Sequence, residues 1–330
     1  MTYDCFTFFN ELDLLEIRLH TLADVVDRFV ITEATRTHRG QPKELLFEKN
    51  RERFAAFADK IIYLVVDDLL PEEEISKDAF HLAWVNENRQ RNELARGLKN
   101  LQDDDVILVS DLDEIPRPEK VAEAVRLAQL GEIVRFDLDL FVVYANCKDY
   151  RTPHWKLGTV AISGRTYRTS KAIDRVQCNR YTVASECQGR CLQKVRFLKQ
   201  SKRIANGGWH MSYLGGAEAI KKKLHAFSHA EASRLENKVD ERLKAGLDVR
   251  GGRRNTFGVP LDDTFPKYLV ANQTKFAHLI FALPDGYLRA TRLQRLSATL
   301  RGIAYRTVFK CLPRRLIDLL APFYRKLTSR

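Results

Sequence analysis

The chain has 330 residues, of which 45% are hydrophobic and 30% charged, so it can bury a sizeable core and is too apolar to be generally disordered. Its formal net charge of +12 would ordinarily suggest a polyanionic partner. Residues 289–330, however, contain eleven lysines and arginines and a single acid, Asp318, and account for +10 of that charge. The nearly neutral remainder argues against a nucleic-acid-binding role for the body of the chain.

The sequence carries no pattern typical of secretion or membrane insertion. No run approaches the roughly 20 apolar residues needed to span a bilayer, and an apolar strand-like segment follows Met1 without a basic leader. We therefore expect a cytoplasmic protein. Six dispersed cysteines favour reduced thiols over a disulfide framework, and the Cys187 and Cys191 pair lacks a second ligand pair at zinc-site spacing.

The first 110 residues alternate short apolar runs with amphipathic segments. The pattern predicts strands over residues 3–9, 27–32, 61–66 and 105–109, and helices over 12–22 and 84–98. Strands separated by helices indicate an α/β fold with a mostly parallel central sheet. Because ligands of such sheets bind beyond the carboxyl ends of the strands, polar residues that follow each apolar run are candidate site residues.

The second part of the chain is less regular. We expect a helix over residues 119–127, an apolar run over 133–144, a glycine-flanked turn region over 206–216, a charged helix over 217–245 and a basic loop over 246–258. Basic amphipathic helices follow. The predicted domains are therefore a main α/β domain over 1–245, a closing segment over 246–285 and a basic helical tail over 286–330.

An acidic motif, Asp111-Leu112-Asp113-Glu114, ends the fourth predicted strand. In extended backbone, residues two apart project to the same side, so Asp111 and Asp113 can converge on one cation. Carboxylates suit Mg²⁺ or Mn²⁺, which would bridge the phosphates of a nucleotide and neutralise a leaving diphosphate. A solvated turn that ends at Pro116 is the structural alternative, but three acids at one strand end favour a counter-ion.

The predicted helix before this strand contains Arg89, Arg91 and Asn92. The two arginines cannot both face the core. One guanidinium would match the geometry of a diphosphate, and Asn92 would hydrogen-bond a base or ribose. A polar, solvated helix face is the alternative interpretation.

Five segments resemble glycosyltransferase family 17, in the expected order along the chain. They are residues 3–19, 29–38 (FVITEATRTH), 90–92 (QRN), 110–118 (SDLDEIPRP) and 207–216 (GGWHMSYLGG). The resemblance covers about residues 3–280. It implies a GT-A-type, Rossmann-like nucleotide-sugar-binding domain, UDP-GlcNAc as donor, Mn²⁺ or Mg²⁺ as cofactor, and inversion at the anomeric carbon.

The same resemblance implies roles for individual residues. Asp111 and Asp113 match the metal-binding D-x-D, and His210 falls where a late metal or diphosphate ligand is expected, with a packed histidine beside Trp209 as the alternative. The implied nucleotide contacts are Asn10, Glu11, Glu33, Arg91, Asn92 and Asp111.

Inversion requires a base that takes the proton of the acceptor hydroxyl on the face opposite the leaving UDP. Four acids of the second half are candidates, and each is alternatively a surface or helix-start residue: Glu218, Asp137, Asp139 and Glu231.

The resemblance implies transfer of GlcNAc from UDP-GlcNAc to a glycan or lipid-linked acceptor, with another nucleotide-sugar donor as an alternative. A phosphatase of the haloacid-dehalogenase type is disfavoured, because its D-x-D normally follows the first strand. A basic binding module for anionic membranes or nucleic acid is the non-enzymatic alternative. Residues 286–330 mix arginines with Leu, Ile, Phe and Tyr, which predicts either helices on an anionic membrane surface or helices packed on the catalytic domain.

Overall fold

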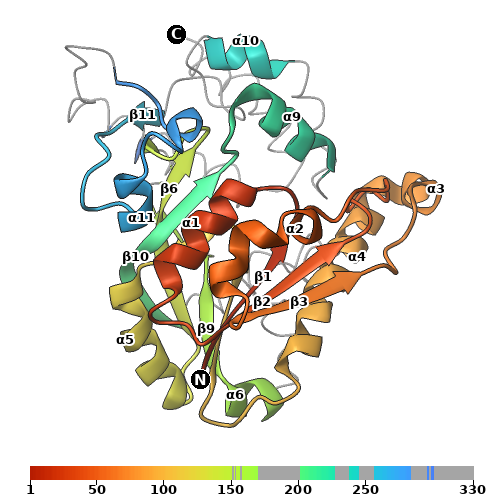
Figure 1. Cartoon of the computed structure of the whole chain (residues 1–330), viewed down its shortest axis with the longest axis vertical. Helices are drawn as coiled ribbons and strands as arrows, with labels where there is room; N and C mark the ends of the chain where they lie inside the picture. The colour runs from red at the N-terminus through yellow and green to blue at the C-terminus, as the bar shows by residue number, and fades with distance from the viewer. Residues whose placement is uncertain are drawn as a thin grey trace.

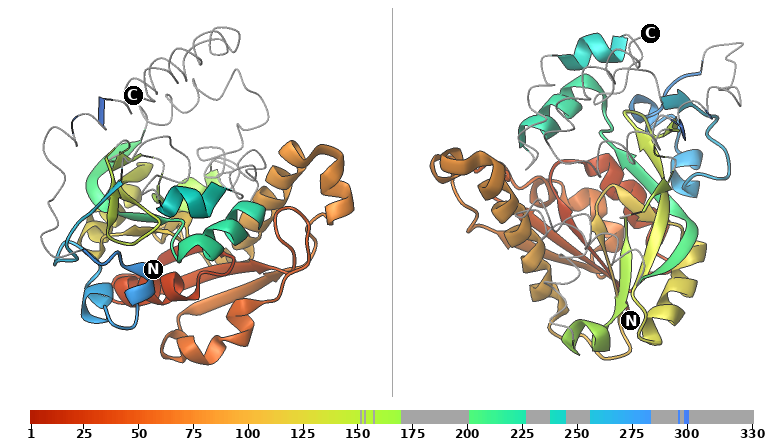
Figure 2. Two further views of the ribbon diagram at one scale, coloured as in Figure 1. Left: turned by 90° about the horizontal axis from the view of Figure 1, so that it is seen from above. Right: turned by 180° about the vertical axis from the view of Figure 1, so that it is seen from behind.

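The computed structural model describes residues 1–150, 152, 154–156, 158–169, 201–226, 238–244, 256–283, 296, 299 and 300. These residues form one mixed sheet, covered by helices on both faces (Figure 1). Helix α1 (Leu12–Leu22) covers one face, and the rear view in Figure 2 shows α4 (Ala79–Asn92) on the other. The α/β class is therefore confirmed.

The first half of the sheet is parallel, in the order β3-β2-β1-β4. Its strands are β1 (Thr2–Phe8), β2 (Arg28–Ala34), β3 (Ile61–Val66) and β4 (Val106–Asp111). Alternate residues build two apolar layers: Phe6 and Phe8 face the layer of α1, and Tyr3 and Cys5 face the layer of η3 (Glu93–Leu98). The predicted strands and the helix over 12–22 are confirmed to within two residues.

The predicted helix over 84–98 begins earlier and changes type. The carboxylate of Asp78 accepts a hydrogen bond from the backbone N–H of His81, so α4 begins at Ala79, and its continuation after Asn92 is the 3₁₀ helix η3. The remaining elements of this half are α2 (Leu46–Lys49), η1 (Arg51–Phe57), α3 (Glu72–Ile75) and η2 (Ser76–Asp78).

The second half of the sheet, called the antiparallel half below, comprises β5 (Glu114–Pro116), β6 (Val134–Val142), β7 (Cys147–Asp149), β8 (His154–Trp155), β9 (Val160–Ser163), β10 (Lys202–Ser212) and β11 (Thr256–Gly258). It pairs its strands antiparallel except for β6 and β10, which are parallel. The sheet as a whole is therefore mixed, and the prediction of a mostly parallel sheet is not confirmed. Strands β6 to β9 follow one another over connections too short for a helical crossover, and short connections give antiparallel neighbours.

The glycine-rich segment over 206–216 was predicted as a turn, and this is wrong for residues 206–212, which belong to β10. A Cβ on Gly208 would lie 2.1 Å from the carbonyl oxygen of Ile115, so the glycine allows β10 to lie against β5. The turn comes later, where Gly215 and Gly216 have φ angles of 99° and 78°.

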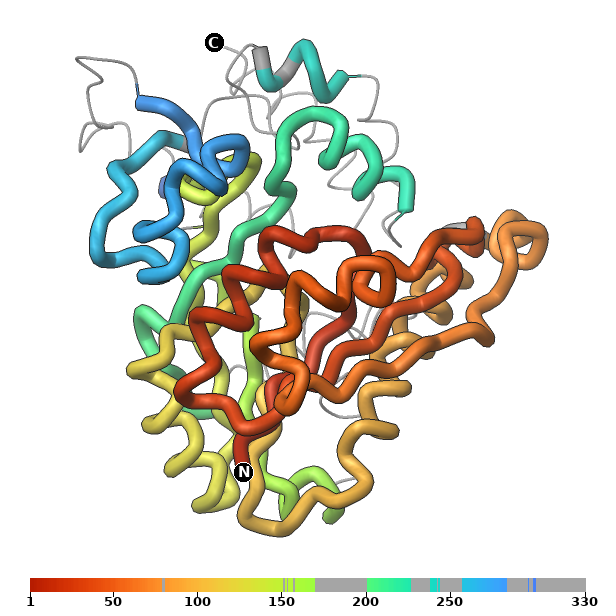
Figure 3. The backbone as a smooth tube through the Cα atoms, viewed as in Figure 1, coloured from red at the N-terminus to blue at the C-terminus, as the bar shows by residue number. Residues whose placement is uncertain are grey.

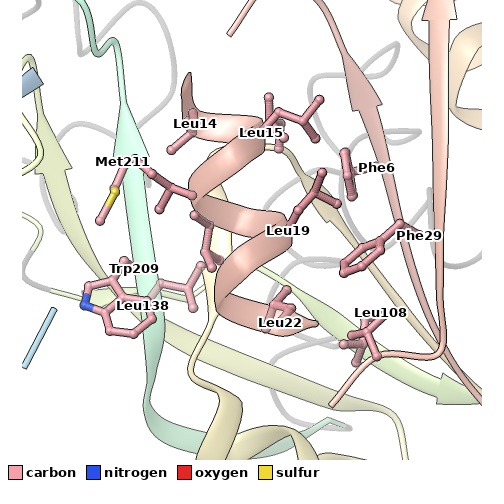
Figure 4. Close-up of a cluster of buried hydrophobic side chains, with 14 of the residues drawn as sticks. Phe6, Leu14, Leu15, Leu19, Leu22, Phe29, Leu108, Leu138, Trp209 and Met211 are labelled. Carbon is pink, nitrogen blue, oxygen red and sulfur yellow. The ribbon is translucent and has the colours of Figure 1, made fainter. Parts of the chain in front are cut away.

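Helix α1 occupies the centre of the larger core (Figure 4). Leu15 and Leu19 are completely buried in the same cluster as Phe6 and Phe29 of the strands, and β10 closes its other side. Each fully buried leucine contributes about 1.5–3 kcal/mol. This packing fixes the position of every residue that α1 presents to the sheet.

Other helices flank the sheet and its upper end. They are α5 (Pro118–Gln129), α6 (Gly164–Thr169), α9 (Gly216–Ala226), α10 (Val239–Lys244), α11 (Lys267–Ala271) and η6 (Ala277–Leu279). The helix predicted over 119–127 is confirmed as α5. The one predicted over 217–245 is present as α9 and α10, and residues 227–237 between them lie outside the described part of the chain.

The segment 256–283 returns to the domain, as the blue part of the tube in Figure 3 shows. Strand β11 pairs with β7, and the indole Nε1 of Trp209 donates to the carbonyl oxygen of Thr264 at 3.1 Å. Apart from residues 296, 299 and 300, the tail over 286–330 lies outside the described residues. Within the described part, no helix combines the length and hydropathy that a bilayer crossing requires.

Candidate active site

A cavity opens at the carboxyl ends of the parallel strands, where α/β sheets of this kind bind ligands. Its walls come from β1, α4, the acidic turn after β4, the second half of the sheet and α9. The lining residues include Phe9, Glu11, Arg36, Thr37, His38, Lys43, Glu87, Arg91, Asp111, Asp113, Asp149, Trp155, His210, Tyr213, Lys223 and Ala226.

The backbone of the acidic turn is held by Arg18, a completely buried residue of α1. Its Nη1 donates to the carbonyl oxygens of Asp111, Leu112 and Glu114 at 2.9, 3.0 and 2.9 Å. Nε and Nη2 bind the two carboxylate oxygens of Asp4 at 2.8 and 2.6 Å. The sequence interpretation missed Arg18, although an arginine between apolar positions of a core-facing helix, with Asp4 inside an apolar strand, was an available signal.

Glu114, the third acid of the motif, supports the turn instead of facing the cavity. Its buried carboxylate accepts hydrogen bonds from the indole Nε1 of Trp155 at 2.8 Å and from the backbone N–H of Asp111 at 3.1 Å. It therefore joins the turn to β8, and Trp155 in turn lines the cavity beside His210, with ring centroids 4.9 Å apart.

Arg91 lies in the cavity wall and bonds to the acidic turn. Its Nη2 contacts the Asp111 carboxylate at 2.6 Å and the Glu87 carboxylate at 2.8 Å. Arg89 is exposed, which confirms that only one of the two arginines faces inward. Asn92 is also exposed and is not among the residues that line the cavity, so the structure gives no support to a nucleotide contact there.

Asp113 is buried among cationic and aromatic neighbours. Its Oδ2 lies 3.1 Å from Lys223 Nζ, and its Oδ1 lies 3.5 Å from His210 Nε2. Burial alone would raise the pKa of this carboxyl, but Lys223 and His210 outweigh it and hold the pKa well below its usual range. Asp113 is therefore a carboxylate that stays charged.

Three residues were predicted to contact the nucleotide after the first two strands. Glu11 lines the cavity and lies 3.1 Å from Lys223 Nζ, whereas Asn10 is not among the lining residues. Glu33 is completely buried outside the cavity lining, and the structure gives it a different role. Its carboxylate accepts hydrogen bonds from Lys43, from the hydroxyl of Tyr63 and from the first N–H groups of α2.

The structure does not bring the predicted bases to the cavity. Asp137 is buried between Arg135 and Arg203, Asp139 pairs with Lys148 Nζ at 2.9 Å, and Glu218 is exposed on α9. Glu231 lies outside the described residues.

Asp149, at the end of β7, is a buried acid of the second half that lines the cavity. The sequence offered only a weak signal for it: an acid shortly after the apolar run over 133–144.

Asp113 and His210 are the candidate ligands for a divalent cation. Asp113 and His210 present a carboxylate and an imidazole side by side, donor types that Mn²⁺ accepts, and the buried Nδ1 of His210 has no hydrogen-bond partner among the described residues. No group of three potential protein ligands is assembled in the described part of the chain. The donor chemistry fits a metal that takes its remaining ligands from diphosphate and water.

The mixed α/β sheet thus places a buttressed acidic turn at the carboxyl ends of its parallel strands, where α/β sheets bind ligands. The profile of glycosyltransferase family 17 matches residues 1–190, more than half of the chain, and the chain belongs to this family.

Three mammalian relatives are named β-1,4-mannosyl-glycoprotein 4-β-N-acetylglucosaminyltransferase. The human, rat and mouse proteins are 27%, 33% and 32% identical to this chain over 297 residues. The aligned region covers 82% of this chain and 53% of each relative, so the chain spans about half their length.

Proposed function

We propose that the chain transfers N-acetylglucosamine from UDP-GlcNAc to a hydroxyl group of a glycan or lipid-linked glycan, with inversion at the anomeric carbon. The observation that carries the proposal is the acidic turn, which Arg18 fixes at the mouth of a cavity in a member of glycosyltransferase family 17. The relatives are named as N-acetylglucosaminyltransferases, and this supports N-acetylglucosamine as the transferred sugar.

The donor would lie across the carboxyl ends of the parallel strands. Phe9, Thr37 and His38 line the end of the cavity formed after β1 and β2, and would surround the base and ribose. Arg91 and Lys223 would attract the diphosphate, because guanidinium and ammonium groups form charge-assisted hydrogen bonds to phosphate oxygens.

A bound Mn²⁺ or Mg²⁺ would supply positive charge that stabilises the departing diphosphate. Asp113 and His210 are the residues that would hold it, and Asp111 would act through its bond to Arg91 and its place in the same turn. Arg18 and Glu114 keep this turn in place before any ligand binds, which limits the reorganisation that binding requires.

We assign the base to Asp149 in place of the four acids suggested by sequence. Its carboxylate would accept the proton of the acceptor hydroxyl as the new C–O bond forms and UDP leaves from the opposite face of the sugar. Its support is its position: it is buried, it lines the cavity and it comes from the half of the sheet opposite the acidic turn.

Isothermal titration with UDP-GlcNAc, UDP-glucose and UDP-galactose in Mn²⁺, followed by assays of UDP release with candidate acceptors, tests the donor and the activity together. The proposal expects UDP-GlcNAc to bind best and to release UDP only with an acceptor hydroxyl present. If UDP-glucose or UDP-galactose binds better, that nucleotide-sugar is the donor instead of UDP-GlcNAc. Hydrolysis of small phosphate esters without nucleotide-sugar turnover would favour a phosphatase.

We further propose that the basic tail, residues 286–330, holds the protein on the cytoplasmic face of an anionic membrane, where lipid-linked acceptors are found. Each Lys or Arg near such a surface contributes roughly 1 kcal/mol, and salt screens the attraction. The full chain should co-sediment with phosphatidylglycerol vesicles at low salt, and a chain ending at Asp285 should not. Equal binding of both would leave the tail a structural element.

A further inference from the structure

Lys223 occupies the position between two acids of the candidate site. Its Nζ lies 3.1 Å from Glu11 Oε1 and 3.1 Å from Asp113 Oδ2, and its side chain is only 14% exposed. The lysine comes from α9, whereas the acids follow β1 and β4, so this ion-pair cluster joins the two halves of the fold. Figure 1 shows α9 above the ends of these strands.

Glu11 and Asp113 carry two negative charges, and Lys223 is a cation that contacts both. Other cationic groups lie nearby, because Lys43 acts electrostatically on Glu11 and His210 lies 3.5 Å from Asp113. A divalent cation held by Asp113 and His210 would place its charge beside the carboxylate that Lys223 contacts. The metal ion and the ammonium group would then repel each other strongly, because interactions over such distances are little screened when buried.

We propose that Lys223 and the divalent cation are alternative partners of the Asp113 carboxylate, which His210 also approaches, and that the metal displaces Lys223 from Asp113 toward the diphosphate of the donor. This inference rests on the metal-dependent transfer proposed above. It explains how a site with a lysine on its central carboxylate can still bind a metal. It also gives Lys223 a separate role in the loaded site, as a cation for the leaving diphosphate.

The packing of α9 allows this exchange without movement of the helix. Ile220 and Leu224 are buried and anchor α9, while Lys223 projects into the cavity on a side chain with four rotatable bonds. The ring of Tyr213 also lines the cavity, with its centroid 5.7 Å from Lys223 Nζ, and offers a nearby aromatic face for a displaced ammonium group.

The test measures binding of Mn²⁺ alone to the full chain by isothermal titration, without nucleotide. Lys223→Met should bind Mn²⁺ about tenfold more tightly than the wild type or more, because the competing charge is gone. Lys222→Met is the control: Lys222 is the exposed neighbour on α9, and its affinity should equal the wild-type value. Lys223→Arg, which keeps the charge, should also remain close to wild type.

A second measurement separates competition from a general effect on folding. In saturating Mn²⁺, UDP affinity should be about tenfold weaker for Lys223→Met, because the diphosphate loses a charged hydrogen bond. Thermal unfolding with and without Mn²⁺ should show a larger metal-induced stabilisation for Lys223→Met than for wild type. If Lys223→Met does not fold, the same comparisons apply to Lys223→Gln.

Two results would overturn the inference, and they are distinguishable. If Lys223→Met binds Mn²⁺ no more tightly than wild type, while Asp113→Asn loses binding, Lys223 does not compete but the metal site stands. If no variant, including Lys223→Met, binds Mn²⁺ either alone or in the presence of UDP, both the competition and the metal-dependent part of the proposed function are wrong.

Discussion

The two halves of the sheet contribute to the site in different ways. The parallel half presents the acidic turn and Arg91, and Arg18 and Glu87 of the same half position them. Trp155 of β8 and the backbone N–H of Met211 in β10 add bonds to the turn from the antiparallel half. The antiparallel half reaches the same cavity with Asp149, His210 and Lys223, from strands and a helix that approach from far along the chain.

The two halves of the sheet would therefore have different roles in the proposed reaction. In the proposed function the parallel half would form a prearranged receptor for the donor, because hydrogen bonds from Arg18 fix its turn. The antiparallel half supplies the groups that would act on the acceptor and the leaving group. Variants in the first half should therefore change stability and donor affinity together, and variants in the second half should change turnover with the fold intact.

The largest expected effect lies in the antiparallel half. Asp149→Asn should lower kcat by about 10²–10⁴-fold, because an amide cannot accept the acceptor proton, while UDP affinity stays within about twofold of wild type. Steady-state kinetics and UDP titration measure both quantities.

Asp139→Asn is the comparison variant for Asp149, since Asp139 pairs with Lys148 and is not among the cavity-lining residues. Its kcat should stay within about twofold of wild type. A kcat of Asp149→Asn above about a tenth of the wild-type value would remove Asp149 from the role of base.

In the parallel half, Arg18→Met should lower the free energy of unfolding by about 3–5 kcal/mol. The substitution leaves Asp4 buried without its counter-ion and removes the donor to three carbonyl oxygens of the acidic turn. Urea unfolding at neutral pH measures the loss. Arg96→Met, which breaks a half-exposed pair with Glu93, should change stability by less than about 0.5 kcal/mol. A similarly small loss for Arg18→Met would contradict the account.

Arg91→Ala should raise the donor KM or lower kcat by an amount equivalent to about 1.5–3 kcal/mol, the usual contribution of a hydrogen bond to a charged group. The variant removes both the cation facing the diphosphate and the partner of Asp111. Arg89 lies two residues before Arg91 on α4 and is exposed, so Arg89→Ala should behave as wild type. If the donor KM and the kcat of Arg91→Ala stay within roughly twofold of wild type, Arg91 has a purely structural role.

The smallest effect concerns the contact between α1 and segment 256–283. Burial would raise the pKa of Glu16, but hydrogen bonds from Lys275, Tyr268 and Arg53 lower it to about 2. A lowered carboxyl pKa adds stability above the pKa of the unfolded chain, about 4.3, and this contribution is lost as pH falls from there toward 2.

Urea unfolding between pH 5 and pH 2 should therefore show a steeper loss of stability for wild type than for Glu16→Gln. Glu123→Gln, on the exposed side of α5, should keep the wild-type slope. Identical slopes for all three proteins would show that this contact does not couple the two regions.

Much of the parallel half could be predicted from sequence, because each strand and its following helix form a local unit with its own hydrophobic period. The acidic turn and the inward arginine of α4 were found in this way. Glu33 was misread because acids at the carboxyl end of a strand can either bind a donor or cap a helix. Only the structure shows that Glu33, near the end of β2, caps α2.

The antiparallel half could not be predicted to the same depth. β6 pairs with β10, so its partner lies more than 60 residues away in sequence, and no local period records that pairing. Gly207 and Gly208 were taken for a turn because glycine serves both turns and close strand contacts. Lys223 and Asp149 line the same cavity as the acidic turn only because of this tertiary arrangement.

The central claim is that the acidic turn holds the diphosphate of a nucleotide-sugar through a metal. Titration of UDP-GlcNAc in Mn²⁺, combined with an assay of UDP release, tests it most directly when wild type is compared with Asp113→Ala and with Glu218→Ala, whose exposed side chain lies outside the cavity lining. The account predicts that Asp113→Ala keeps its fold, binds the donor at least about tenfold more weakly and loses most UDP release, while Glu218→Ala matches wild type. Full donor binding and UDP release by Asp113→Ala in the presence of a chelator would contradict it.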